Sequence, residues 1–328
     1  MRRREFITLL GSAAAAWPVA AGAQPRERMR RIGFMFGTLP PDDPEGQARL
    51  TAFVQRLQEL GWTDGRNVRI EYRWGLGDAD RLRKSANELV ALAPDAILAG
   101  GNPALMALQQ ATGTLPIVFA NAVDPVGFGS VASLARPGGN STGFMNVEFS
   151  VSGKLLELLK ETAPAVARVA VLRNPATGLG QFGAVQATAS SFGVELIPIG
   201  DRNADEIERG IAAFVRGPTD GLIATYQGQA KAERDRTIAL AAQYGLPAIY
   251  PFRRFVADGG LMSFGTDQAE PYRLAAGYVD RILRGEKAGN LPVQAPTKYE
   301  LVINLQTAKK LGLTIPPPLL ARADEVIE

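Results

Sequence analysis

Short runs of apolar residues alternate along the chain with longer segments in which apolar residues recur every three or four positions. The short runs predict buried β-strands, and the longer segments predict amphipathic helices. In residues 47–60, for example, Leu50, Phe53 and Leu57 share one helical face, and Gly61 supplies a stop. Strands are predicted at 31–36, 68–72, 96–99, 117–120, 169–172, 194–198, 221–225, 248–250 and 261–264. Because helical segments fill the gaps between these strands, the pattern predicts an α/β protein with parallel sheets.

The number of strand and helix units exceeds what one doubly wound sheet ordinarily carries. Residues 136–144, R-P-G-G-N-S-T-G-F, interrupt the pattern near the middle, and their Gly, Asn and Ser content is typical of a connection. We therefore expect two lobes joined by three crossings, with the later crossings near 265–267 and 296–299. The N-terminal lobe is predicted to comprise residues 31–144 plus about 267–297, and the C-terminal lobe residues 145–266 plus about 298–328.

Neither cysteine nor histidine occurs in the 328 residues. Their absence excludes disulfides, cysteine-ligated zinc, thiolate nucleophiles and Ser-His triads. The Gly-rich segment at 100–102 lacks the G-x-G-x-x-G spacing of a dinucleotide fold, and 136–139 lacks the G-K-[ST] of a P-loop. Nucleotide binding is therefore disfavoured, and we expect no cofactor, no metal and no catalytic residue.

The first residues have the features of an export signal. Arginines at 2–4 precede an apolar run over 6–21, and the run ends in the small residues A-G-A, the form of a signal-peptidase site. We predict a signal peptide at 1–23, cleaved after Ala23. The pair Arg3 and Arg4 resembles a twin-arginine signal, with the general secretory route as the alternative. Since the run is shorter than the ~20 residues of a membrane span, the mature chain is expected to be periplasmic and without a span.

Removal of that signal lowers the formal net charge from +3 to +1. The remaining cluster of arginines, at 26–31, has the position of a solvated linker after the signal. Nucleic-acid-binding proteins concentrate Lys and Arg in a surface patch. We therefore expect no nucleic-acid partner.

Polar residues directly before proline follow several predicted strands. Asn102, Asp124 and Asn174 stand in this position, where Asn or Asp can cap a helix and Pro fits its first turn. Ligands of open α/β sheets bind outside the carboxyl ends of the strands, and helix N-termini attract anions. Asp124 is then placed to hold a ligand ammonium group, while Tyr226 and Tyr250 offer aromatic faces and hydroxyls. The structural alternatives are capping alone for the three polar residues and packing for the tyrosines.

Longer motifs carry a resemblance over nearly the whole mature chain. They are LQELGW at 57–62, GRNVRIEYRW at 65–74, AVDPVG at 122–127, SLARPGGNSTGF at 133–144, AVLRNP at 170–175, LPAIYPF at 246–252 and LVINLQTAKKLG at 301–312. With these motifs the chain resembles the ABC transporter substrate-binding protein family, tryptophan/tyrosine type. The resemblance implies a type I periplasmic-binding fold, with two Rossmann-like lobes joined by three crossings and a small molecule clasped between them.

The resemblance also implies a function and a set of contacts. The chain would capture a small solute, an amino acid or aromatic compound, for an ABC permease with a separate ATPase, and would act as a monomer without catalysis. Carried over residue by residue, the ligand contacts fall at Thr38, Asn102, Asp124, Asn174, Tyr226, Tyr250 and Asp267. Two alternatives remain: a sensory ligand-binding subunit for a membrane receptor, and an exported enzyme using the carboxylates of Asp124 and Asp267.

Overall fold

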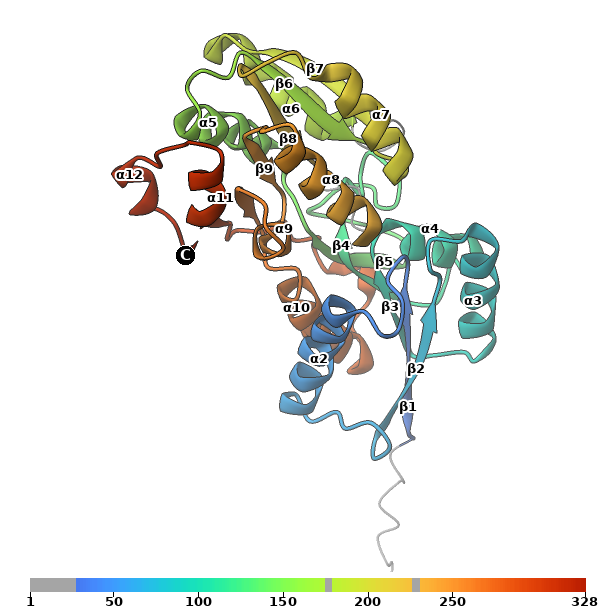
Figure 1. Cartoon of the computed structure of the whole chain (residues 1–328). Coiled ribbons are helices and arrows are strands. Elements are labelled where there is room, and N and C mark those ends of the chain that lie inside the picture. The colour runs from blue at the N-terminus through green and yellow to red at the C-terminus, as the bar shows by residue number, and fades with distance from the viewer. Residues whose placement is uncertain (1–27, 175–178, 226–230) are drawn as a thin grey trace, which may run out of the picture.

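The computed structural model describes residues 28–174, 179–225 and 231–328. The predicted export signal, with Arg3, Arg4 and Ala23, and the candidate contact Tyr226 lie outside the described residues. Two lobes are visible in Figure 1, built on sheets with strand orders β2-β1-β3-β4-β5 and β12-β11-β10-β9-β8-β6-β7. The predicted α/β fold with two lobes is confirmed. Within the described ranges, no helix has both the length and the apolar character needed to cross a membrane.

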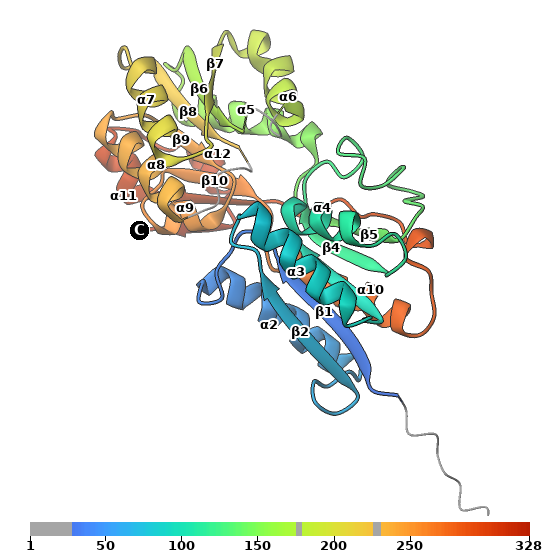
Figure 2. The same cartoon turned by 90° about the vertical axis from the view of Figure 1, so that its right-hand side faces the viewer.

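The N-terminal lobe is a parallel sheet with helices on both faces. Its strands are β1 (Arg30–Phe36), β2 (Val68–Trp74), β3 (Ala96–Gly100), β4 (Ile117–Ala122) and β5 (Ser141–Met145). Helices α2 (Pro44–Glu59) and α10 (Glu270–Leu283) cover one face, and α3 (Ala79–Ala91) and α4 (Asn102–Ala111) cover the other (Figure 2). Consecutive residues of β1 point to opposite faces of the sheet. Phe34 packs into the apolar core under α2 and α10, and Met35 packs into the core under α3 and α4.

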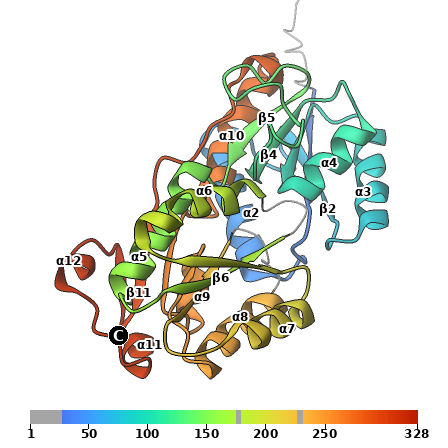
Figure 3. The ribbon, with the colours of Figure 1, turned by 90° about the horizontal axis from the view of Figure 1, so that it is seen from above.

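The C-terminal lobe has a larger sheet. Its strands are β6 (Arg168–Arg173), β7 (Glu195–Gly200), β8 (Asp220–Ala224), β9 (Ala248–Tyr250), β10 (Met262–Gly265), β11 (Glu300–Asn304) and β12 (Glu325–Ile327). Its α-helices are α5 (Gly153–Thr162), α6 (Leu179–Ala189), α7 (Ala204–Phe214), α8 (Lys231–Gln243), α9 (Arg253–Ala257), α11 (Leu305–Lys310) and α12 (Pro317–Leu320). Helices α11 and α12 lie beside α5 and β11 at one end of the lobe (Figure 3). One pair departs from the predicted parallel order, because β11 returns from the other lobe and runs antiparallel to β10.

The chain passes between the two sheets at three places. Strand β5 continues into residues 146–152, β10 continues into 266–269, and the chain returns through 291–299. The crossings bond to one another: Thr266 Oγ1 donates to the Asn146 carbonyl, and the Glu148 N–H donates to the Tyr299 hydroxyl, each at 3.0 Å. Because β5 and β10 each run directly into a crossing, the carboxyl ends of the parallel strands in both sheets face the boundary between the lobes.

Strand β5 lies inside the segment that the sequence suggested was a connection. Residues 141–145 pair with β4 and are buried, so the connection predicted over 136–144 is wrong for its last residues. Gly143 accounts for the misleading composition. Its φ is +153°, and a Cβ there would lie 2.1 Å from the carbonyl oxygen of Phe119. Glycine is therefore required by close packing against β4, and here it does not mark a turn.

Candidate functional site

Loops after the carboxyl ends of the strands carry most of the predicted contacts. Thr38 follows β1 and is exposed, Asp124 follows β4, and Asn174 follows β6 and is half-buried. Each of these loops lies at the boundary where the two sheets face each other. At Asn102 and Asp124 the geometry differs from the simple helix caps that the sequence predicts.

Asn102 holds the loop after β4 in place. Its Nδ2 donates to the carbonyl of Val123 at 2.8 Å, and the Val123 N–H donates to its Oδ1, also at 2.8 Å. The N-cap of α4 is Gly101, and Asn102 is the first helical residue. The predicted capping role of Asn102 is therefore wrong, because its side-chain amide is committed to a backbone 21 residues away.

The end of β4 and the loop after it each contain a residue in a strained backbone conformation. Asn121 has φ of +59° and Asp124 has φ of +45°, values that non-glycine residues adopt at a cost and that concentrate at binding sites. Asn121 Nδ2 donates to the carbonyl of Gln268 at 3.0 Å, which ties the end of β4 to the second crossing. Asp124 Oδ1 accepts the N–H of Gly127 at 2.9 Å. Asp124 thus closes a turn and caps no helix, since none begins between β4 and β5.

Tyr250 lies in the core of the C-terminal lobe. The residue is 1% exposed, and its ring stacks on Phe255 with the centroids 4.9 Å apart. Burial raises the pKa of its hydroxyl. The structure therefore favours the packing alternative for Tyr250 over ligand contact.

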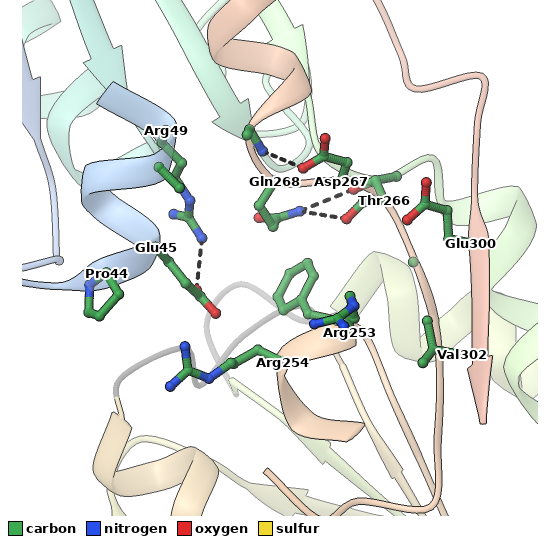
Figure 4. A pocket seen from close by; sticks show the side chains of 14 residues that line it. Pro44, Glu45, Arg49, Arg253, Arg254, Thr266, Asp267, Gln268, Glu300 and Val302 are labelled. Carbon is green, nitrogen blue, oxygen red and sulfur yellow. Dashed lines mark hydrogen bonds and ion pairs between the residues drawn. The ribbon is translucent and has the colours of Figure 1, made fainter. Parts of the chain in front are cut away.

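A pocket of about 410 Å³ opens between the lobes at the ends of β9 and β10 (Figure 4). Helix α2 contributes Glu45 and Arg49 from one lobe, α9 contributes Arg253 and Arg254 from the other, and the second crossing contributes Asp267. Asp267 is exposed, and its Oδ1 accepts the N–H of Ala269 at 2.8 Å. Of the predicted contacts that the structure describes, Asp267 is the one that lines this pocket.

Arg49 is the most deeply buried charge of the pocket. The residue is 5% exposed, and its Nη2 lies 3.3 Å from Oε2 of Glu45, toward which the guanidinium points in Figure 4. Its Nε and the Oε1 of Gln268 are both buried without a hydrogen-bond partner in the described part of the chain. Two residues that line the pocket thus hold one unbonded donor and one unbonded acceptor, and leaving each unbonded costs about 1–3 kcal/mol.

Charges on the two lobes act on each other across the pocket. The Nε of Arg254 lies 3.0 Å from Oδ2 of Asp258 in its own lobe. The carboxylates of Asp258, and after it Glu45 and Asp43 of the other lobe, raise the pKa of Arg254. The acidic start of α2 and the basic start of α9 are therefore electrostatically complementary.

Sequence reasoning missed Arg49, although a signal for it exists. Arg49 precedes Phe53 by four positions and Leu57 by eight, so it lies on the apolar face of its helix. A charged residue on the buried face of a helix rarely occurs without a partner or a role. No comparable sequence signal marks Gln268, whose burial depends on the path of the crossing.

Comparison with known proteins agrees with the two-lobed architecture. A family model described as ABC transporter substrate binding protein matches residues 43–327. A tyrosine-binding protein of Clostridioides difficile is 26% identical over 263 residues, which cover 80% of this chain and 75% of the relative.

Two solved structures show the same fold over most of the chain. A conserved domain protein of Vibrio cholerae is 27% identical, with a TM-score of 0.82 over 91% of this chain and 100% of the other. An ABC domain of Streptococcus pneumonia in complex with L-Trp is 24% identical, with a TM-score of 0.81 over 91% of this chain and 99% of the other. With the family match extending from the start of α2 to the last strand, the chain belongs to the ABC transporter substrate-binding protein family.

Proposed function

We propose that this chain is the extracytoplasmic solute-binding subunit of an ABC importer, which captures an amino acid between its lobes and delivers it to a permease driven by a separate ATPase. The observation that carries the proposal is the pocket between the lobes, where the buried cation Arg49 and the carboxylate of Asp267 line one cavity. Family membership supports a transport role, and the tyrosine-binding relative supports an amino acid as the solute.

The chemistry of the pocket suits a zwitterion. The unbonded Nε of Arg49 is placed to donate to a solute carboxylate, and Asp267 and the unbonded Oε1 of Gln268 are placed to accept from an ammonium group. Hydrogen bonds between charged groups are the stronger class in proteins. Thr38, Asp124 and Asn174 are candidates for further contacts from the neighbouring loops.

Capture involves a hinge motion of the lobes. The second crossing, 266–269, both lines the pocket and connects the lobes, so a bound solute touches a segment that must bend when the lobes move. A solute that contacts both α2 and α9 binds the closed arrangement better than the open one and shifts the population toward it. We also propose that the chain reaches the periplasm through the signal containing Arg3 and Arg4, with cleavage after Ala23.

The test is a thermal melting panel of the purified mature chain with each of the twenty L-amino acids. Saturation at about 100 times Kd should add about 2.7 kcal/mol of stability. That gain corresponds to a rise of roughly 5–10 °C, since 1 kcal/mol shifts Tm by about 2–4 °C in proteins near this size. The absence of a shift with every amino acid would refute the proposed solute class.

Two arginine variants localise the binding. Arg49→Met should weaken amino-acid binding at least tenfold, because it removes the buried donor. Arg281→Met removes the same charge from α10 of the same lobe, where Arg281 is exposed and paired with Glu286 at 2.7 Å. Equal affinity of the two variants would show that the solute does not contact Arg49.

A further inference from the structure

Arg173, Asp201 and Glu233 gather at the carboxyl edge of the C-terminal sheet. Arg173 is the last residue of β6, Asp201 follows β7, and Glu233 lies in the first turn of α8, the helix after β8. Strands β8, β6 and β7 are adjacent and parallel, so their ends bring these side chains to one place. The pocket with Arg49 lies at the ends of β9 and β10, so this cluster occupies another part of the same lobe boundary.

Each of the three side chains contains at least one buried polar atom that has no hydrogen-bond partner in the described ranges. These atoms are Nε and Nη1 of Arg173, Oδ1 of Asp201 and Oε2 of Glu233. Asp201 is 5% exposed. The guanidinium of Arg173 lies over the ring of Phe182, 5.2 Å from its centroid. Donors and acceptors are therefore gathered together without satisfying one another, whereas buried polar groups are normally bonded.

A structural aspartate in the same lobe shows the contrast. Asp220 is 1% exposed, and its carboxylate accepts from Arg168 Nη1 at 2.6 Å and from the N–H groups of Arg216 and Gly217 at 2.6 and 3.1 Å. Asp201 has no comparable set of donors at Oδ1. The carboxylate of Asp220 is thus fully hydrogen-bonded within the fold, whereas Oδ1 of Asp201 is free to accept a hydrogen bond from a ligand.

The charges around Asp201 also indicate a functional site. Burial, then the carboxylates of Glu206 and Glu233, raise the pKa of Asp201 from 3.8 to about 7, and Arg173 opposes the rise. Glu206 is bonded to Arg202 at 3.0 and 3.2 Å. An acid with a strongly raised pKa near a cation that has two unbonded nitrogens is typical of a functional site.

We propose that Arg173, Asp201 and Glu233 form a second recognition site at the lobe boundary, which binds the far end of the solute through a hydroxyl or amide that both donates and accepts hydrogen bonds. Arg173 donates to the oxygen of that group, and the carboxylates accept its hydrogen. An apolar end of the same shape leaves every member of the cluster unbonded, so the site selects polar side chains. The inference rests on the proposed capture of an amino acid.

The experiment compares amino acids matched in shape, by calorimetric titration of the full mature chain. The pairs are L-tyrosine with L-phenylalanine, L-threonine with L-valine, and L-glutamine with L-methionine. In whichever pair binds, we expect the polar amino acid to bind at least about tenfold more tightly than its apolar partner. Arg173→Met and Asp201→Val should reduce this preference below about threefold and leave the affinity of the apolar member unchanged. Glu195→Gln is the control, at the opposite end of β7 with its side chain 69% exposed.

The outcomes separate the second site from the capture function. Binding without preference in the wild type, or a preference that both variants retain, overturns the second site and leaves capture standing. No binding in any pair or with any other amino acid overturns both. Melting without solute gives a further readout, because a purely structural cluster predicts a lower Tm for Asp201→Asn, whereas the recognition site predicts an unchanged or higher one. A fall of several degrees for this shape-preserving variant therefore also overturns the second site.

Discussion

Replacing Asp201 with asparagine should change how the stability of this protein depends on pH. The pKa of Asp201 rises from 3.8 to about 7 in the folded chain because burial and two neighbouring carboxylates oppose its ionisation. Between these pH values the folded state holds a proton at Asp201 that the unfolded state does not. Stability gained from that proton is therefore present at low pH and is lost as the pH rises toward 7.

The size of the effect follows from the pKa values. One pKa unit corresponds to about 1.36 kcal/mol, so the two pH units between pH 5 and the folded pKa of about 7 correspond to about 2.7 kcal/mol of stability, which the wild type loses between pH 5 and about pH 8. Asparagine keeps the shape of the protonated acid and has no proton to lose. Asp201→Asn should therefore match the wild type near pH 5 and exceed it by about 2.7 kcal/mol near pH 8.

Urea unfolding at pH 5, 6, 7 and 8 measures this difference directly. All other titrating groups are common to both proteins, so the difference between the two curves isolates Asp201. Asp220→Asn serves as the matched control: it breaks a bonded buried pair with Arg168 and should lower the free energy of unfolding by about 3–5 kcal/mol. Parallel curves for the wild type and Asp201→Asn would refute the reasoning about the burial and neighbours of Asp201.

Two further substitutions test how the site is held. Asn102→Ala removes both bonds to the Val123 backbone and should cost roughly 2–3 kcal/mol in urea unfolding; a loss below about 0.5 kcal/mol would contradict the clamp. Gly143→Ala places a Cβ 2.1 Å from the Phe119 carbonyl and should cost at least about 3 kcal/mol or abolish soluble expression. Gly277→Ala in α10, where an added Cβ meets no atom within 4 Å beyond the backbone of its own helix, should instead stabilise the protein by about 0.5–1 kcal/mol.

The sequence predicts the buried parallel strands well because their apolar runs are bounded by helical segments. The run at 248–250 matches β9, and the run at 96–99 lies within β3. The sequence pattern misses β5, β11 and β12, and β12 pairs only with β11. Strand β5 contains a glycine demanded by packing against β4, and β11 joins its sheet only after the chain has returned from the other lobe. Neither circumstance leaves a periodic pattern in the residues themselves.

The candidate site is less predictable, because its chemistry depends on neighbours that are distant in sequence. Asn102 is a residue type that often caps helices, but its side chain is hydrogen-bonded to the backbone of Val123, in the loop after the next strand. Asp201 looks like a turn residue in the sequence, but its pKa is raised first by burial and then by the carboxylates of Glu206 and Glu233, which lie on two different helices. The sequence predicts Asp267 only through the family resemblance, because the pocket that Asp267 lines forms where the two lobes meet.

Both lobes of this protein are built from segments that are discontinuous in the chain. Helix α10 completes the N-terminal core, where Tyr272 stacks on Phe34 with the ring centroids 6.2 Å apart. Strands β11 and β12 complete the C-terminal sheet. A growing polypeptide that has reached β10 therefore contains neither finished lobe, and such long-range pairing makes folding slow and late. Native structure has to wait for nearly the whole chain, and this delay leaves a period in which the newly made polypeptide remains unfolded and depends on protection from aggregation.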